Sequence, residues 1–167
     1  MAGRGLAGDT DGGAAMTTAN SHLGFREMTW VLYSAVSSRS GQRNWDAVRQ
    51  HYHPEARLVR TGVNADGSPF AHVMTLDDFI ESIEVLLKDV QFTEVELSQE
   101  AVVFGNVARL TSVYEFSWVS ATETRRGRGV NFFTLIQDAG RWLIMSIVWD
   151  SERAGLALPK ALERISA

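Results

Sequence analysis

His72 and Asp150 are the side chains whose chemistry first suggests proton transfer in this sequence. An unperturbed imidazole changes its charge near neutral pH, which suits a general base. His72 stands just before a predicted helix, and Asp150 ends a predicted strand. Two interpretations of each stay open: His72 is a base or an ordinary rim histidine, whereas Asp150 pairs with Arg60 or His72 or caps the following turn.

A metal site is not predicted at the cluster formed by His51, His53 and Glu55. Their two-residue spacing does not place them on one helical face, and Pro54 interrupts the segment. The chain also contains no cysteine, so it has neither a thiolate nucleophile nor a Cys-ligated metal site. We therefore expect chemistry without a metal or an organic cofactor.

The densest basic cluster, RRGRG, consists of Arg125, Arg126 and Arg128 with two intervening glycines. No aromatic residues alternate with these arginines, and the whole chain carries a formal charge of -4. These features favour a solvated strand end or a salt-bridged dimer edge over a nucleic-acid patch. Gly127 and Gly129 suggest a bulge or bend in the strand.

Length and composition indicate one globular domain, because 45% of the 167 residues are hydrophobic and 22% are charged. We expect a flexible glycine-rich tail at residues 1–22, a domain at 23–152 and a C-terminal extension at 153–167. No apolar run approaches the roughly 20 residues that a membrane span needs. No apolar run follows the early arginine, so a secretory signal is not expected, and a cytoplasmic protein is the simplest interpretation.

Residue periodicity predicts helices in the first half of the domain and strands in the second. Helices are expected at 24–39, 45–52 and 76–90, the last opened by a capping box of Thr75 with Asp78. A strand at 56–61 and an extended piece at 70–74 lie between them. Four long antiparallel strands follow at 92–104, 107–120, 122–137 and 141–150. In the second of these, one face carries Ala108, Leu110, Ser112, Tyr114, Phe116 and Trp118.

This order of elements indicates an α+β domain, and at this point the chain resembles the nuclear transport factor 2-like superfamily and its SnoaL-like group. The resemblance rests on NWDAVRQHYHPEARL (44–58) and FFTLIQDAGRWLIMSIVWD (132–150), and it spans residues 25–150. It implies a cone-shaped fold with three N-terminal helices packed on a curved, mainly antiparallel sheet. Its concave face would make a pocket for a small apolar molecule.

The same resemblance suggests which polar residues face this pocket. Arg60 falls where ketosteroid isomerases carry a general-base carboxylate, and because arginine stays protonated, that isomerase mechanism is disfavoured. Arg60 is instead an anion or carbonyl anchor, or a surface charge paired with a neighbouring acid. Tyr33 matches a hydrogen-bond donor of those enzymes, and Asn131 lies within a residue of a second donor. Tyr114 and Trp118 would supply aromatic walls.

The expected function is therefore binding of a small hydrophobic, oxygenated molecule, as a cofactor-independent isomerase, cyclase or dehydratase. The alternative is a non-catalytic dimeric binding or regulatory module. A homodimer through the sheet is expected because the final strand has apolar residues on both faces, and helices on one side can bury only one of them. Neither nucleic acid nor a membrane is an expected partner.

Overall fold

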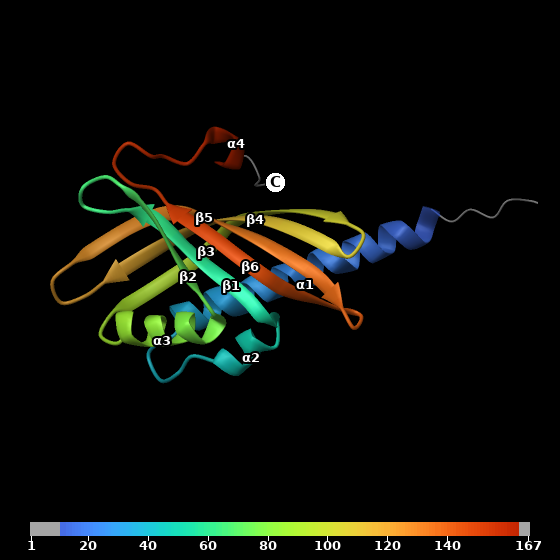
Figure 1. Ribbon diagram of the computed structural model, residues 1–167, viewed down its shortest axis with the longest axis horizontal. Coiled ribbons are helices and arrows are strands. Elements are labelled where there is room, and N and C mark those ends of the chain that lie inside the picture. Colours follow the sequence, from blue (N-terminus) through green and yellow to red (C-terminus); the bar gives the residue numbers. More distant parts are fainter. Residues whose placement is uncertain (1–10, 164–167) are drawn as a thin grey trace, which may run out of the picture.

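The computed structural model describes the backbone of residues 11–163, which form one α+β unit built on a single sheet (Figure 1). The elements, in chain order, are α1 (Asp11–Ser37), α2 (Trp45–Arg49), β1 (Tyr52–Val63), β2 (Pro69–Met74), α3 (Leu76–Leu86), β3 (Gln91–Phe104), β4 (Val107–Val119), β5 (Thr124–Asp138), β6 (Arg141–Ser151) and α4 (Lys160–Glu163).

The six strands lie in the order β2-β1-β6-β5-β4-β3. All neighbouring pairs are antiparallel except β1 and β6, which are parallel. The C-terminal strand β6 therefore lies between β1 and β5, and it joins the N-terminal hairpin to the long meander of β3 to β5. The predicted mainly antiparallel sheet is confirmed.

The buried face of the sheet is covered by α1, which packs against β3, and by α3, which contacts β1 and β2. The predicted apolar stripe of α1 is confirmed, because Phe25, Met28, Leu32, Ala35 and Val36 are all buried. They join sheet residues such as Leu58, Leu110 and Phe133 in one hydrophobic core.

The start of α3 also matches its prediction. Thr75 accepts a hydrogen bond from the backbone N–H of Asp78, and the Asp78 carboxylate accepts one from the Thr75 backbone N–H. This reciprocal capping box satisfies two donors that a helix start leaves unpaired. It holds α3 directly after β2 and so places the helix beside the inner face of the sheet.

Two features of the helices differ from the sequence-based prediction. Three N-terminal helices are not confirmed, because α2 has only five residues. Helix α1 begins at Asp11, so residues 11–22 of the predicted tail are helical, and this end of α1 projects beyond the sheet in Figure 1. Residues 1–10 lie outside the described part of the chain.

The C-terminal extension packs on the outer face of the sheet. Leu158 is buried against Val113 of β4 and Val130 of β5. Glu152 anchors the segment, since its carboxylate accepts two hydrogen bonds from Arg128, at 2.9 and 3.0 Å, and one from the backbone N–H of Leu158 at 2.8 Å. Part of the outer face is thus covered by the chain itself.

The rest of this face keeps exposed apolar side chains. Strand register places Phe132 beside Val148, and Phe104 beside Val107, on the outer side. We define the outer patch as these four residues and Val102; their exposure ranges from 37% for Val148 to 89% for Phe104. None of the helices in residues 11–163 is long and apolar enough to cross a membrane.

We expect the outer patch to be covered by a second copy of the chain. Phe132→Glu should shift a dimer towards monomer, because it places a charge in the centre of an apolar contact. Light scattering at micromolar concentration measures the change, with Trp30→Glu on α1 as the control that leaves the mass unaltered. A stable monomer for the unmodified chain would contradict the prediction.

Candidate functional site

A cavity of about 730 Å³ lies between α1, α3 and the inner face of the sheet. Its apolar walls include Leu32, Leu58, Phe79, Phe92, Phe116 and Trp149. Four of the residues predicted to bind a ligand line this cavity, together with the candidate base His72: Arg60, Tyr114, Trp118 and Asn131. The volume falls within the range of about 300–1,000 Å³ that is typical of small-molecule pockets.

Aromatic rings make up one side of the cavity. Phe92 stacks on Phe116 with 6.1 Å between ring centroids, and it meets Trp118 edge to face at 6.3 Å. Strand alternation explains this arrangement, because Tyr114, Phe116 and Trp118 are two residues apart on β4 and face the same side.

Two glycines of β5 make room for these rings. A Cβ at Gly129 would lie 2.3 Å from the Tyr114 hydroxyl oxygen, and one at Gly127 would lie 2.8 Å from the Phe116 ring. The predicted bulge at these glycines is wrong, since the β4–β5 pairing is continuous through both positions. Because these glycines have no side chains, Phe116 and Tyr114 of β4 can lie across β5.

Two guanidinium groups contribute positive charge to the cavity lining. Arg60 is exposed at the rim, with its Cζ 5.9 Å from the centroid of the Phe70 ring, and it forms no ion pair among the described residues. Arg125 lies over the Trp118 ring at 4.5 Å. Arg125 was not predicted to line the cavity, because nothing in the RRGRG segment distinguishes it from Arg126 and Arg128; in the structure Arg128 pairs with Glu152.

Tyr33 does not line the cavity but holds a residue that does. Asn131 donates to the Tyr33 hydroxyl at 2.9 Å, and that hydroxyl lies 2.7 Å from Ser112 Oγ. Ser112 donates to Glu96 at 2.5 Å, so the proton between Tyr33 and Ser112 belongs to Tyr33. Burial raises the pKa of Tyr33 well above its usual value, and the phenol stays protonated. The chain of hydrogen bonds thereby orients the Asn131 amide.

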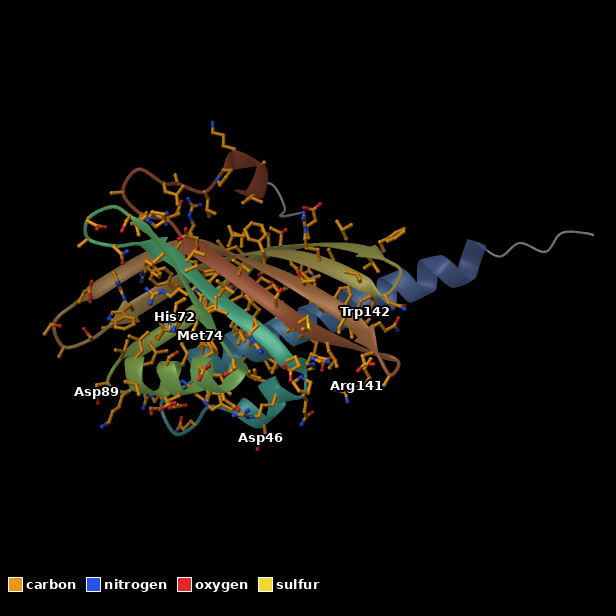
Figure 2. All side chains as sticks on the ribbon, in the orientation of Figure 1. Asp46, His72, Met74, Asp89, Arg141 and Trp142 are labelled. Atoms are coloured by element: carbon orange, nitrogen blue, oxygen red, sulfur yellow. The ribbon has the colours of Figure 1, made fainter. Side chains whose placement is uncertain are left out.

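The candidate acid–base pair of His72 and Asp150 does not form. His72 is opposite Arg60 in the β1–β2 register, and Figure 2 shows it beside Met74 near α3. Asp150 bonds to Arg153 Nη1 at 2.6 Å and to the Ser151 backbone N–H at 2.8 Å. Partial burial alone would raise the pKa of Asp150. The hydrogen bonds together have the larger effect, so the pKa of Asp150 is lowered. Asp150 therefore acts with the C-terminal segment.

Three carboxyl groups line the cavity, and Glu94 of β3, which was not predicted, is less exposed than Asp78 and Glu81 of α3. Burial raises the pKa of Glu94 to about 8, and a hydrogen bond from Asn131 opposes part of that rise. Alternation with Phe92 along the predicted strand could have placed Glu94 on an inward face. No group of three or more acidic or histidine side chains in residues 11–163 is arranged to hold a metal ion.

Comparison with solved structures identifies the fold. A candidate scytalone dehydratase from Novosphingobium aromaticivorans matches with a TM-score of 0.64 at 11% identity, covering 83% of this chain and 89% of that one. A nuclear transport factor 2-like superfamily protein from Salmonella enterica matches with a TM-score of 0.63 at 12% identity, covering 81% and 94%. The chain has a nuclear transport factor 2-like fold.

A third match is a protein of unknown function and carries no biochemical information. This protein, from Mycobacterium tuberculosis, has a TM-score of 0.62 and 15% identity over 89% of this chain and 79% of its own. No protein-family model matches the chain, and no curated protein matches it significantly. At such identities the similarity establishes the fold, and function has to be argued from the cavity of this chain.

The nuclear transport factor 2-like domain should lose stability with rising pH because of Glu94. Its pKa is raised from 4.5 to about 8 on folding, so between these values the folded state binds the proton and the unfolded state does not. The contribution of Glu94 to stability is then fully present below pH 4.5 and is lost as the pH rises towards 8. The slope approaches about 1.4 kcal/mol per pH unit at most.

Urea unfolding of the unmodified chain and of Glu94→Gln, at half-unit steps from pH 5 to 9, measures this contribution as the difference between the two. Comparison with the variant removes the effects of Asp78 and Glu84, whose lowered pKa values act in the opposite direction. Glu81→Gln, which removes an exposed carboxyl from α3, is the matched control. A pH-independent difference for Glu94→Gln would contradict the prediction.

Proposed function

We propose that this protein is a small-molecule-binding domain of the SnoaL-like kind, which takes a hydrophobic, oxygenated compound into its cavity without a metal or organic cofactor. The proposed ligand-binding residues are Arg60, Tyr114, Trp118 and Asn131, with Tyr33 positioning Asn131. Glu94 and Arg125 join this set.

The cavity itself is the observation that carries the proposal. Most of its wall is aliphatic or aromatic, and only a few polar groups converge on it. Such a combination is typical of sites that bury a small ligand, in which apolar contacts supply affinity and a few polar groups fix orientation. The Tyr114 hydroxyl, one of these polar groups, is itself held in position, because it lies 3.0 Å from Ser151 Oγ.

Catalysis is the second candidate function, in the form of a cofactor-independent isomerase, cyclase or dehydratase. Glu94 is the observation that favours it over a non-catalytic binding or regulatory module, because a carboxyl with a pKa near 8 can exchange a proton near neutral pH. His72 and Asp150 do not offer an alternative acid–base pair, because Asp150 is hydrogen-bonded to Arg153 and Ser151. The proposed binding function does not depend on this choice.

We expect Arg60→Leu to weaken binding of an anionic aromatic probe, 1-anilinonaphthalene-8-sulfonate, by about 1–3 kcal/mol, the range for a hydrogen bond to a charged group. The melting temperature should change little, because Arg60 is exposed and forms no ion pair among the described residues. Fluorescence titration gives the affinity and the number of probe molecules bound per chain.

Arg57→Leu is the matched control, since Arg57 lies on the same strand but outside the cavity, 3.6 Å from the Glu55 carboxylate. Its affinity for the probe should match that of the unmodified chain. Phe132→Glu separates binding in the cavity from adsorption to the outer patch. Equal affinity for Arg60→Leu and the unmodified chain would reject the anchor, and probe binding lost only in Phe132→Glu would reject the cavity as the site.

A further inference from the structure

A row of five residues crosses the sheet near the C-terminal ends of β1 and β6. On one side of the row, Phe70 of β2 is paired with Gly62 of β1. On the other side, Ser151 of β6 is paired with Gly129 of β5, which is in turn paired with Tyr114 of β4. We call these five residues the rim row. In it, Ser151 stands between two glycines, and an aromatic residue stands beyond each glycine.

The rim row belongs to the cavity side of the sheet. Gly62 is two residues from Arg60 on β1, and Ser151 is two residues from Trp149 on β6, so the members of each pair share a face. Arg60 is paired with Trp149 in the parallel β1–β6 register. Arg60, Trp149, Ser151 and Tyr114 all line the cavity. The side chain of Arg60 therefore lies next to the rim row on the same face.

The two glycines let aromatic rings lean across their strands towards Ser151. A Cβ at Gly62 would lie 2.8 Å from the Phe70 ring, and one at Gly129 would lie 2.3 Å from the Tyr114 hydroxyl oxygen. Phe70 thus lies over β1 and Tyr114 over β5, and these strands are the two neighbours of β6. The rim row consequently brings a ring to one side of Ser151 and a hydroxyl to the other.

Phe70 also supports the guanidinium of Arg60, whose Cζ lies 5.9 Å from the centroid of the ring. Asp78 and Glu81 line the same cavity, but in residues 11–163 Arg60 forms an ion pair with neither of them nor with any other acid. A cation–π contact holds the side chain without using its N–H donors. Arg60 therefore keeps its donors for a ligand.

The two hydroxyls of the rim row have one proton more than their mutual contact uses. Tyr114 Oη lies 3.0 Å from Ser151 Oγ, and either oxygen can be the donor. Whichever donates, the other keeps its own O–H, and neither hydroxyl has a second hydrogen bond within residues 11–163. Burial raises the pKa of Tyr114, so the phenol stays protonated, and the positive charge of Arg60 opposes part of that rise. The guanidinium is thus close enough to act on this hydroxyl.

We propose that the rim row and Arg60 form a carboxylate subsite, in which the guanidinium of Arg60 and the remaining O–H of the Tyr114–Ser151 pair bind the carboxylate of a ligand whose apolar body fills the cavity. The ligand class is an aromatic or alicyclic carboxylic acid. The planar guanidinium matches the geometry of a carboxylate. This inference rests on the proposed function and names the chemistry at one end of the same cavity.

The charges around the cavity determine the orientation of such a ligand. Arg60 and Glu94 line the cavity from β1 and β3, and three strands lie between them. No cation forms an ion pair with Glu94 within residues 11–163, so a ligand carboxylate beside it would be desolvated without compensation. At the rim, Arg60 is exposed, and the carboxylate is both paired and partly hydrated. The carboxylate therefore lies at the rim and the apolar body lies inside.

The test compares 2-naphthaleneacetic acid with 2-naphthaleneacetamide, which share a ring system and differ in the head group. Each displaces a neutral fluorescent probe, N-phenyl-1-naphthylamine, at pH 7.5, where the acid is ionised. The acid should displace the probe at a concentration about tenfold lower than the amide, because hydrogen bonds between charged groups are stronger than those to a neutral carbonyl. Isothermal titration calorimetry measures the two dissociation constants directly.

Variants of Arg60 assign this preference to its charge. Arg60→Gln keeps a donor but removes the charge, so the acid and the amide should bind with affinities within about twofold of each other. Arg60→Lys keeps the charge without the planar fork and should give an intermediate ratio. Arg57→Gln, on the same strand but outside the cavity, is the matched control and should keep the ratio of the unmodified chain. A purely structural defect would weaken both compounds together and leave their ratio unchanged.

Variants of the two hydroxyls test the shared donor. Tyr114→Phe leaves the Ser151 O–H to donate, and Ser151→Ala leaves the Tyr114 O–H, so each should weaken binding of the acid by about threefold at most. The double variant has neither hydroxyl and should weaken it by about tenfold or more. The two effects are therefore expected to be strongly non-additive. Circular dichroism and thermal melting confirm that each variant is folded.

Three results would overturn the carboxylate subsite: equal affinity of the unmodified chain for the acid and the amide, a preference for the acid that Arg60→Gln retains, or a double hydroxyl variant that binds the acid as tightly as the unmodified chain. If the neutral probe and the amide still bind in these cases, the proposed function stands without the subsite. Absence of binding by the probe and by both naphthalene compounds rejects the proposed function and the subsite with it.

Discussion

The two principal helices cover only part of the inner face of a six-stranded sheet, and the rest of the structure follows from that constraint. Helix α1 lies against β3 at one edge, and α3 lies against β1 and β2 at the other. The inner side chains between them cannot all reach a helix, so a cavity remains between the two helices and the sheet. Because both of these helices lie on the inner face, neither of them covers the outer face of the sheet. The C-terminal segment covers Val113 and Val130, and the outer patch is left exposed.

The polar groups in and behind the cavity are organised by one direction of hydrogen bonding. Glu96 accepts from Ser112, which accepts from Tyr33, which accepts from Asn131. Each hydroxyl in this series uses its proton on the side of Glu96, so the Tyr33 hydroxyl can only accept from the Asn131 amide nitrogen. Asn131 is in turn hydrogen-bonded to Glu94. Hydrogen bonds that end at Glu96, behind the cavity, thereby fix the geometry of Asn131 inside it.

The arrangement differs from the isomerase pattern in the placement of charge. Arg60 stands at the position of the general base in the resemblance, and the carboxyl of the cavity comes from β3 instead. The cationic groups, Arg60 and Arg125, rest on the Phe70 and Trp118 rings. Arg125 also lies 3.9 Å from the Glu123 carboxylate, whereas Arg60 forms no ion pair among the described residues and keeps its guanidinium N–H groups available to an oxygen-bearing ligand.

Local patterns in the sequence determined the elements, and tertiary contacts decided the site. The stripe on α1, the Thr75–Asp78 capping box and the alternation along β4 each depend on residues within a few positions of one another, and each is predictable. The length of α2 and the helical state of residues 11–22 were not predicted. Alternation with Phe92 could have placed Glu94 on an inward face, but its surroundings in the cavity depend on Phe116 and Asn131 from other strands. The same holds for Gly129, whose missing side chain is explained only by the Tyr114 ring that crosses it. Strand register, which brings together residues distant in the sequence, is the property that the sequence alone did not determine.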